Sequence, residues 1–184
     1  DLGAFMDGPF IYLNGNAEHA VGNTMSSGRI VIHGNAGDCL GHSMRGGKIF
    51  VRGSVGYRVG IHMKQFEENY PTIVIGGKAQ SFLGEYMAGG VILVLGLEQD
   101  ESVDSYVGTG IHGGVIYVAG EVDDTLLGAA AKKEEVDGDD IEVIRGLVKD
   151  YNHYFNRKVD VDKMHFTKIV PTSSRPFCNL YTHE

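Results

Sequence analysis

The sequence lacks tryptophan and is poor in cysteine and proline, with two Cys (Cys39 and Cys178) and four Pro in 184 residues. Two cysteines are too few for a disulfide framework or a four-cysteine zinc site. No apolar run approaches the roughly 18 residues that cross a membrane, and no basic and apolar leader is present. We therefore expect a cytoplasmic protein from a reducing compartment.

Positive charge is also scarce: 16 Lys and Arg stand against 24 Asp and Glu, for a formal net charge of -8. An acidic surface repels nucleic acids and anionic membranes, so neither is an expected partner. Nine of the acids fall between Glu121 and Glu142. We interpret this stretch as a solvated linker and cap, because nothing in its spacing makes the carboxylates converge on a metal.

Glycine, in contrast, is abundant, with 27 residues or about twice the usual share. A glycine closes each short apolar run, and the intervals between these glycines are 19, 19, 24, 19 and 24 residues. The glycines are Gly15, Gly34, Gly53, Gly77, Gly96 and Gly120. The five extra residues of the longer units fall in polar stretches, 64–71 and 97–102. This pattern indicates a stacked repeat with insertions in its loops.

Apolar residues recur in phase with these glycines. One series lies four residues before each glycine: Ile11, Ile30, Ile49, Ile73, Ile92 and Ile116. A second series lies two residues before it: Leu13, Ile32, Val51, Ile75, Val94 and Val118. Further series are Ala17, Ala36, Val55, Ala79; Val21, Leu40, Val59, Leu83; and Met25, Met44, Met63, Met87, Ile111. The spacing of two is typical of strands and puts the first two series on one face.

These series predict an all-β fold, a single-stranded β-helix (solenoid) of about six coils in which equivalent residues stack one strand spacing apart. Units of 19 residues are too short for βαβ motifs, and a helical repeat would not tolerate so many glycines. A left-handed hexapeptide solenoid is disfavoured because 19 is not a multiple of six. Handedness does not follow from the spacing.

The segment after Gly120 differs from the repeat. Apolar residues at Ile141, Ile144, Val148, Tyr151 and Phe155 predict an amphipathic helix, capped by Asp139 or Asp140. We expect this helix to cover the open end of the repeat stack, where it would hide a sheet edge. The tail from Val170 to Cys178 is predicted to be extended. The chain thus divides into a glycine-repeat β-helix, 1–120, and an acidic linker, capping helix and tail, 121–184.

No residue pattern predicts chemistry in this chain. No two histidines share a phase in adjacent repeats, as a metal site or a catalytic ladder would require; His33, His42 and His62 are interpreted as surface or corner residues. The sharpest catalytic candidate is Cys39 beside Asp38, with His19 one repeat earlier in the phase of Asp38. A structural thiol is the favoured interpretation.

The glycine-rich stretches 34–37 and 108–114 lack the context of a phosphate-binding loop. The sequence therefore predicts no catalytic, cofactor-binding or metal-binding residue.

The pattern Gly-x-x-Met-x-x-Gly-x-Ile-x-Val-x-Gly-x-x-Gly resembles the glycine-repeat (GXGXG) domain at the C-terminal end of the glutamate synthase large subunit. The resemblance covers nearly the whole chain. It is carried by residues 84–96, Gly-Glu-Tyr-Met-Ala-Gly-Gly followed by Val-Ile-Leu-Val-Leu-Gly, and by residues 108–120, Gly-Thr-Gly-Ile-His-Gly-Gly followed by Val-Ile-Tyr-Val-Ala-Gly. The helix and Phe166-Thr-Lys-Ile-Val-Pro171 resemble the end of that subunit. One of the subunits of formylmethanofuran dehydrogenase shares the glycine repeat alone.

This resemblance implies a right-handed β-helix with a structural role. In the family, an amidotransferase domain with an N-terminal Cys nucleophile releases ammonia from glutamine. An FMN and iron–sulfur synthase domain uses the ammonia to convert 2-oxoglutarate to glutamate, and the β-helix holds these domains together. This chain has neither the N-terminal Cys nor a cluster-binding Cys run. It is therefore expected to be a stand-alone or excised version of the domain, without activity or cofactor of its own.

Two other functions stay open at this point: a scaffold subunit of formylmethanofuran dehydrogenase, or an independent solenoid enzyme. Self-association, the docking faces, and a nicotinamide or ferredoxin electron donor are equally open.

Overall fold

The computed structural model describes residues 1–173. Its regular elements, in chain order, are β1 (Phe10–Leu13), β2 (Arg29–Ile32), β3 (Lys48–Val51), β4 (Thr72–Ile75), β5 (Ala88–Val94), β6 (Gly113–Ala119), the 3₁₀ turn η1 (Asp124–Leu126), β7 (Ala131–Glu134), α1 (Gly138–Phe155), η2 (Val161–Lys163) and β8 (Phe166–Pro171).

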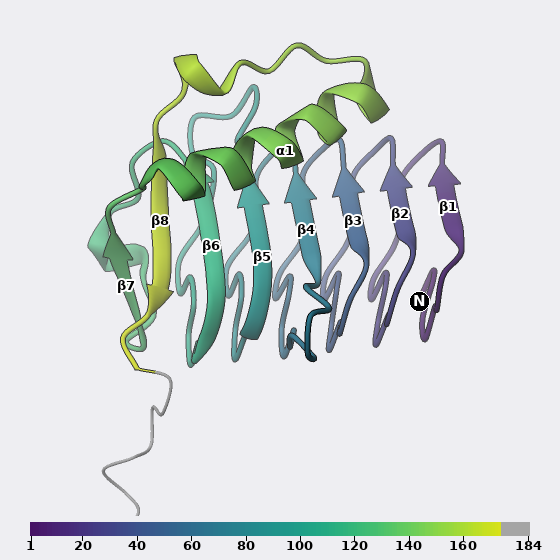
Figure 1. The fold of residues 1–184 in the computed structure, drawn as a ribbon, viewed down its shortest axis with the longest axis horizontal. Helices are drawn as coiled ribbons and strands as arrows, with labels where there is room; N and C mark the ends of the chain where they lie inside the picture. The colour runs from purple at the N-terminus through teal and green to yellow at the C-terminus, as the bar shows by residue number, and fades with distance from the viewer. Residues whose placement is uncertain (174–184) are drawn as a thin grey trace, which may run out of the picture.

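All eight strands belong to one sheet, in the order β1-β2-β3-β4-β5-β6-β8-β7 (Figure 1). Strands β1 to β6 are parallel, and each is shifted from the next by one repeat. The register pairs Ile11 with Ile30. Each following isoleucine of the series is paired in the same way with the next one, as far as Ile116. The predicted stacking of equivalent residues is thus confirmed for the isoleucine series and for the series two residues later.

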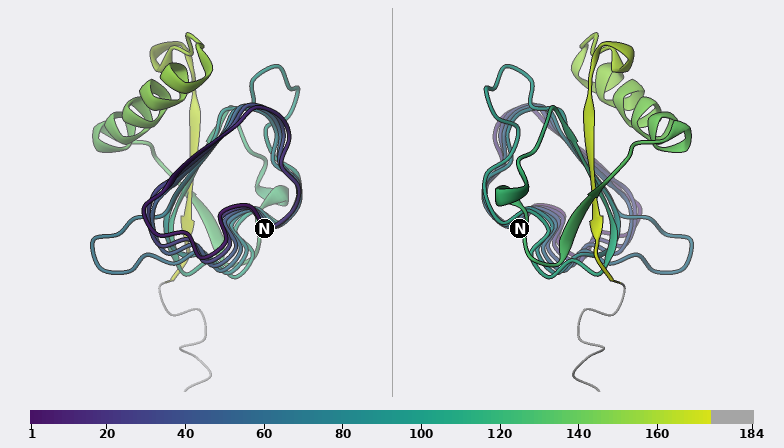
Figure 2. Two further views of the ribbon diagram at one scale, coloured as in Figure 1. Left: turned by 90° about the vertical axis from the view of Figure 1, so that its right-hand side faces the viewer. Right: turned by 90° about the vertical axis from the view of Figure 1, so that its left-hand side faces the viewer.

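The predicted right-handed β-helix solenoid is wrong as the fold class. The sheet is open and mixed, because β8 runs antiparallel to β6 and β7 runs antiparallel to β8. Only four to seven residues of each repeat are strand. The segments that return from one strand to the next run one behind another (Figure 2) but meet through single bridges, such as Ala36 with Val55. Tight turns take up the rest of the 19-residue unit, so within residues 1–173 no second sheet of named strands closes the structure.

The repeat series nevertheless form the interior. One hydrophobic cluster contains the isoleucine series together with the methionine positions, of which Met25, Met44, Met63 and Met87 are fully buried. Gly41, at a positive φ of +72°, shows why glycine recurs at these turns. A Cβ there would lie 2.4 Å from Cδ1 of Ile73, which is itself fully buried. The glycine lets a turn of one repeat pack directly on the isoleucine of another.

The helix α1 is confirmed, but its predicted place at the end of the stack is wrong. It lies across the outer face of the sheet (Figure 1), where it forms a second hydrophobic cluster. The strands contribute the residues between the two inward series, and the helix contributes its apolar stripe. The buried members include Val31, Phe50, Val74, Leu93 and Tyr117 of the sheet and Ile144, Val148, Tyr151 and Phe155 of α1. Each strand from β2 to β6 thus also presents a buried side chain outward, which is why a helix covers this face.

Two further details differ from the sequence prediction. The N-cap of α1 is Asp137, whose side chain accepts from Asp140 N in a capping box, whereas Asp139 or Asp140 was the predicted cap. The end of the stack is covered by β8 and β7 in place of the helix. Of the tail predicted as extended, Val170 and Pro171 lie in β8, and Cys178 lies outside the described residues.

Candidate functional site

A cavity of about 660 Å³ lies at the β7–β8 end of the sheet. Glu121, Lys133 and His165 line its polar side, while Val136, Ile141, Met164 and Phe166 form an apolar wall. The sequence did not single out these residues, because β8 comes from a segment more than 40 positions after β6 and pairs with it only in the folded chain.

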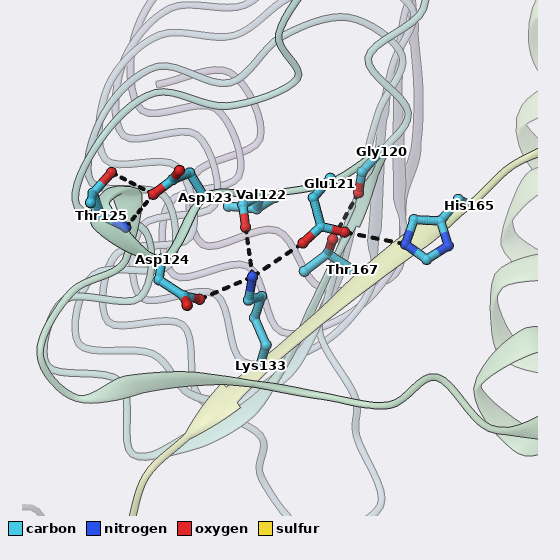
Figure 3. A network of polar contacts seen from close by, with 9 residues as sticks. All are labelled: Gly120, Glu121, Val122, Asp123, Asp124, Thr125, Lys133, His165 and Thr167. Carbon is cyan, nitrogen blue, oxygen red and sulfur yellow. Dashed lines mark hydrogen bonds and ion pairs between the residues drawn. The ribbon is translucent and has the colours of Figure 1, made fainter.

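Lys133 is the centre of a polar network beside this cavity (Figure 3). Its Nζ lies 3.1 Å from Glu121 Oε1, 3.0 Å from Asp124 Oδ1 and 2.9 Å from the carbonyl oxygen of Val122. Hydrogen bonds from the amine, first to Asp124 and then to Glu121, raise the pKa of Lys133. The amine is therefore held protonated, which suits a fixed cation that joins β7 to the segment after β6 and does not suit a nucleophile.

The other members of the network are fixed in the same way. His165 Nε2 lies 3.5 Å from Glu121 Oε2, and both side chains are about 70% exposed. Thr167 Oγ1 donates to the carbonyl of Gly120 at 2.7 Å, and Asp123 caps the turn η1 through Thr125. These contacts tie strand β8 and the acidic segment to the end of β6.

Asp140 forms a second, buried network that joins the sheet to α1. Its carboxylate accepts from Tyr117 Oη at 2.5 Å and from Lys168 Nζ at 2.8 Å. Burial opposes the charge of Asp140, but the hydrogen bonds from Lys168 and Tyr117 outweigh burial and lower its pKa. Burial, and then the bond to Asp140, raise the pKa of Tyr117. A neutral phenol, a carboxylate and an ammonium group thus form one satisfied cluster.

The fold brings together only part of the catalytic candidate predicted from the sequence, which is Cys39 with Asp38 and His19. His19 Nδ1 accepts from the backbone N–H of Asp38 at 2.9 Å and lies 3.5 Å from Asp38 Oδ2. Cys39 is half-buried, and burial followed by the Asp38 carboxylate raises the pKa of its thiol. An activated nucleophile requires the opposite shift. The arrangement fits the structural interpretation of Cys39.

Three other histidines take part in ring contacts. His33 packs between the rings of Tyr12 and Phe155, with centroids 4.6 and 4.9 Å away. His42 and His62 are 6.2 Å apart between ring centroids. Among residues 1–173, no group of three or more His, Cys, Asp or Glu is arranged to hold a metal ion. In the same part of the chain, no helix is both long and apolar enough to cross a membrane.

A column of rings on the turns is the most distinctive surface feature. His62 stacks on Tyr86 with centroids 5.3 Å apart, and Phe82 stacks on Tyr106 at 4.8 Å. The Arg58 guanidinium lies 4.6 Å from the Phe82 ring centroid and pairs with Glu85. All five residues that carry these rings and this cation have positive φ, since they occupy two equivalent turn positions of successive repeats. We refer to His62, Tyr86, Phe82, Tyr106 and Arg58 as the aromatic column.

The composition of the aromatic column fits protein recognition. Tyr86 and Tyr106 are 42% and 55% exposed, so the column presents large rings and one cation to solvent. Tyr and Arg are enriched where protein interfaces have most of their binding energy. The sequence could place these residues in phase, but the phase alone did not reveal the stacking.

Comparison with known proteins finds a matching family model and a similar protein. A family model described as the GXGXG motif matches residues 1–172. An uncharacterized protein of Methanocaldococcus jannaschii, MJ1350, is 52% identical over 191 aligned positions, which cover 99% of this chain and 73% of the relative.

Proposed function

The chain belongs to the GXGXG motif family, the family of the C-terminal domain of the glutamate synthase large subunit, and from this membership we propose that it is a structural subunit or domain of a glutamate synthase. In this role it holds a glutamine amidotransferase polypeptide and an FMN- and iron–sulfur-containing synthase polypeptide at a fixed separation. The match over residues 1–172 is the observation that carries the proposal, because it includes the repeats, α1 and β8.

The repeat stack has the mechanical properties that such a role requires. Six parallel strands stay in one register, and from β2 to β6 each strand has buried side chains on both faces, one in the repeat interior and one under α1. Close-packed interiors of this kind transmit force and resist bending. Rigidity matters if ammonia must pass between two active sites without loss, because the distance between the sites must not drift.

Catalysis and cofactor binding are assigned to the partners in this proposal. The polar groups at the β7–β8 cavity pair with one another, and the pKa of Lys133 is raised and not lowered. In this proposal the synthase polypeptide holds FMN and the iron–sulfur cluster and receives electrons from the donor, and the complex works in the cytoplasm. The chain contributes position and distance to the conversion of glutamine and 2-oxoglutarate to glutamate.

The aromatic column is the surface that we assign to one of these two polypeptides. Its residues come from two turn positions of three successive repeats, so a single partner can contact rings of several repeats. The stacked rings are held in place before binding, which reduces the entropy lost on association.

The test is affinity purification of this chain from native extract, with identification of the co-purifying polypeptides. The proposal predicts an amidotransferase and a flavoprotein with iron and labile sulfide. A Tyr86→Ala/Tyr106→Ala variant should retain markedly less of one of these two partners, while a Tyr70→Ala variant, altered in the 64–71 insertion, should retain both fully. Recovery of molybdenum- or tungsten-containing subunits in place of these partners would assign the chain to the alternative complex.

A further inference from the structure

A second cavity, of about 290 Å³, opens where the ends of β2 and β3 meet the segment after α1. Its charged lining comes from three separate parts of the chain: Arg52 after β3, Glu98 after β5, and Arg157 after the C-cap of α1. His33, Asn35, Ser54 and Gln99 complete its polar surface. Two cations face one anion here, although the whole chain has a net charge of -8.

The hydrogen-bond donors around this cavity have few partners. Within residues 1–173, the guanidinium group of Arg52 forms no hydrogen bond or ion pair with another side chain. Arg157 has a single contact with Glu98, of 3.3 Å, and the Glu98 side chain is 75% exposed. Two buried side-chain nitrogens in the described part of the chain have no hydrogen-bond partner, and both line this cavity: His33 Nε2 and Arg157 Nε.

Buried polar atoms without partners are rare in folded proteins because each costs free energy. His33 and Arg157, which carry these two nitrogens, both line one cavity beside Arg52, whose guanidinium group has no side-chain partner within residues 1–173, and this combination points to a ligand that accepts hydrogen bonds. The hydroxyl of Ser54 already accepts from Lys78 N at 3.0 Å, so its proton is available as a further donor. A group with several acceptor oxygens and negative charge satisfies all of these donors together.

The cavity is also built on firm supports. Tyr151 Oη donates to the carbonyl of Arg52 at 3.0 Å, and Asn156 in the left-handed conformation turns the chain so that Arg157 leaves the helix axis. The His33 ring is packed between Tyr12 and Phe155. The backbone at Arg52 and the ring of His33 are thus held in place before any ligand arrives, which favours binding.

We propose that Arg52, Arg157 and His33 form a binding site for a small oxyanion, a free carboxylate or phosphate. The cavity is large enough for a small dicarboxylate or for inorganic phosphate. The site is separate from the aromatic column and does not depend on the proposed scaffold function.

The experiment is isothermal titration calorimetry of the full chain with inorganic phosphate and, separately, with glutarate, at constant ionic strength. Saturable binding of at least one anion is expected, and the stronger of the two identifies the ligand class. Arg52→Gln and Arg157→Gln should each weaken binding by about tenfold, the usual effect of losing a charged hydrogen bond. Arg45→Gln removes an exposed arginine elsewhere on the repeats and should bind as the parent does.

Nuclear magnetic resonance of the histidine ring nitrogens provides a second readout that does not depend on the variants. The anion should shift the ring signals of His33 and leave those of exposed His19 in place. The proposal is wrong if neither anion binds saturably at millimolar concentration, or if binding is the same in the Arg52 and Arg157 variants as in the Arg45 control. Copurification tests of the scaffold function are unaffected by either result.

Discussion

Tyr151 in α1 donates a hydrogen bond to the backbone carbonyl of Arg52, 3.0 Å away and 99 positions earlier in the chain. The tyrosine is fully buried, and a Cβ at Gly76 would overlap its hydroxyl. One side chain therefore fixes the helix to the ends of β3 and β4.

Replacement of Tyr151 by Phe should destabilise the protein by about 1 to 2 kcal/mol, because the Arg52 carbonyl loses its partner in a buried place. Urea unfolding at neutral pH measures the change. Tyr57→Phe is the control, since the Tyr57 side chain is about half exposed, and its stability should equal that of the parent. Equal stability of the Tyr151 variant would show that the hydrogen bond contributes nothing net.

Alkaline pH should unfold the protein partly through the same residue. Burial raises the pKa of Tyr151 to about 12 from an unfolded value of about 10. The folded state thus retains the phenolic proton that the unfolded state loses, so this contribution is complete below pH 10 and falls as the pH rises from about 10 to 12. Urea unfolding across this pH window should show that Tyr151→Phe loses less free energy of unfolding than the parent does, by about 2 kcal/mol. Tyr117, present in both proteins, contributes equally to both curves.

Replacement of Lys168 by Met should cost about 3 kcal/mol, because it leaves the Asp140 carboxylate buried with only neutral donors. The pKa of Asp140 lies below its usual range. The Asp140–Lys168 pair therefore stabilises the fold fully above the ordinary carboxyl pKa, and this stabilisation is lost as the pH falls through the lowered pKa of Asp140. The variant should therefore lose less stability between neutral and acid pH than the parent. The exposed pair of Lys132 and Glu134 provides the comparison: Glu134→Gln should change stability by less than about 0.5 kcal/mol.

Two glycine substitutions should have opposite signs. Gly41→Ala places a Cβ 2.4 Å from buried Ile73 at a φ of +72° and should destabilise by about 2 kcal/mol or more. Gly146→Ala lies in α1, where a Cβ meets nothing within 4 Å, and should stabilise by about 0.5 to 1 kcal/mol. Thermal unfolding of the two variants beside the parent distinguishes them. Destabilisation by Gly146→Ala would contradict the prediction for α1, and an unchanged stability of Gly41→Ala would contradict the one for the turn.

The sequence predicted the repeat correctly because its signal is periodic. The series from Ile11 to Ile116 recurs with the marker glycines, and the strands pair in that register. The extra residues of the longer units also lie in loops, as expected. Periodicity gives the neighbours of a residue within the stack, but it does not say how the returning segments bond, so the solenoid prediction was wrong.

The position of α1 was also mispredicted. The residues between the two inward series, such as Val31, Phe50 and Val74, are apolar and indicated that the outer face of the sheet is covered. The interpretation of the helix as an end cap ignored this signal. The antiparallel return of β8, and with it the network of Lys133 and Asp140, depends on pairings between distant segments that have no periodic pattern.

The candidate sites were the least predictable part. Arg157 follows a left-handed Asn156 at the end of α1, and only the angle of the helix across the sheet brings it to Arg52 and His33. No spacing in the sequence links these three positions.

The helix across the sheet also limits how many repeats the protein can have. Its 18 residues make it about 27 Å long, and it reaches from Tyr117 in β6, bonded to Asp140, to His33 after β2, in contact with Phe155. Those strands are four intervals apart, about 19 Å at the usual strand separation, and the 15 positions from Asp140 to Phe155 span about 23 Å of helix, so the helix crosses the strands obliquely. An added or deleted repeat between β2 and β6 would leave one end of that rod without its contact. The length of α1 therefore fixes the number of repeats between β2 and β6. It thereby also fixes the distance between partners that bind at different repeats of the stack.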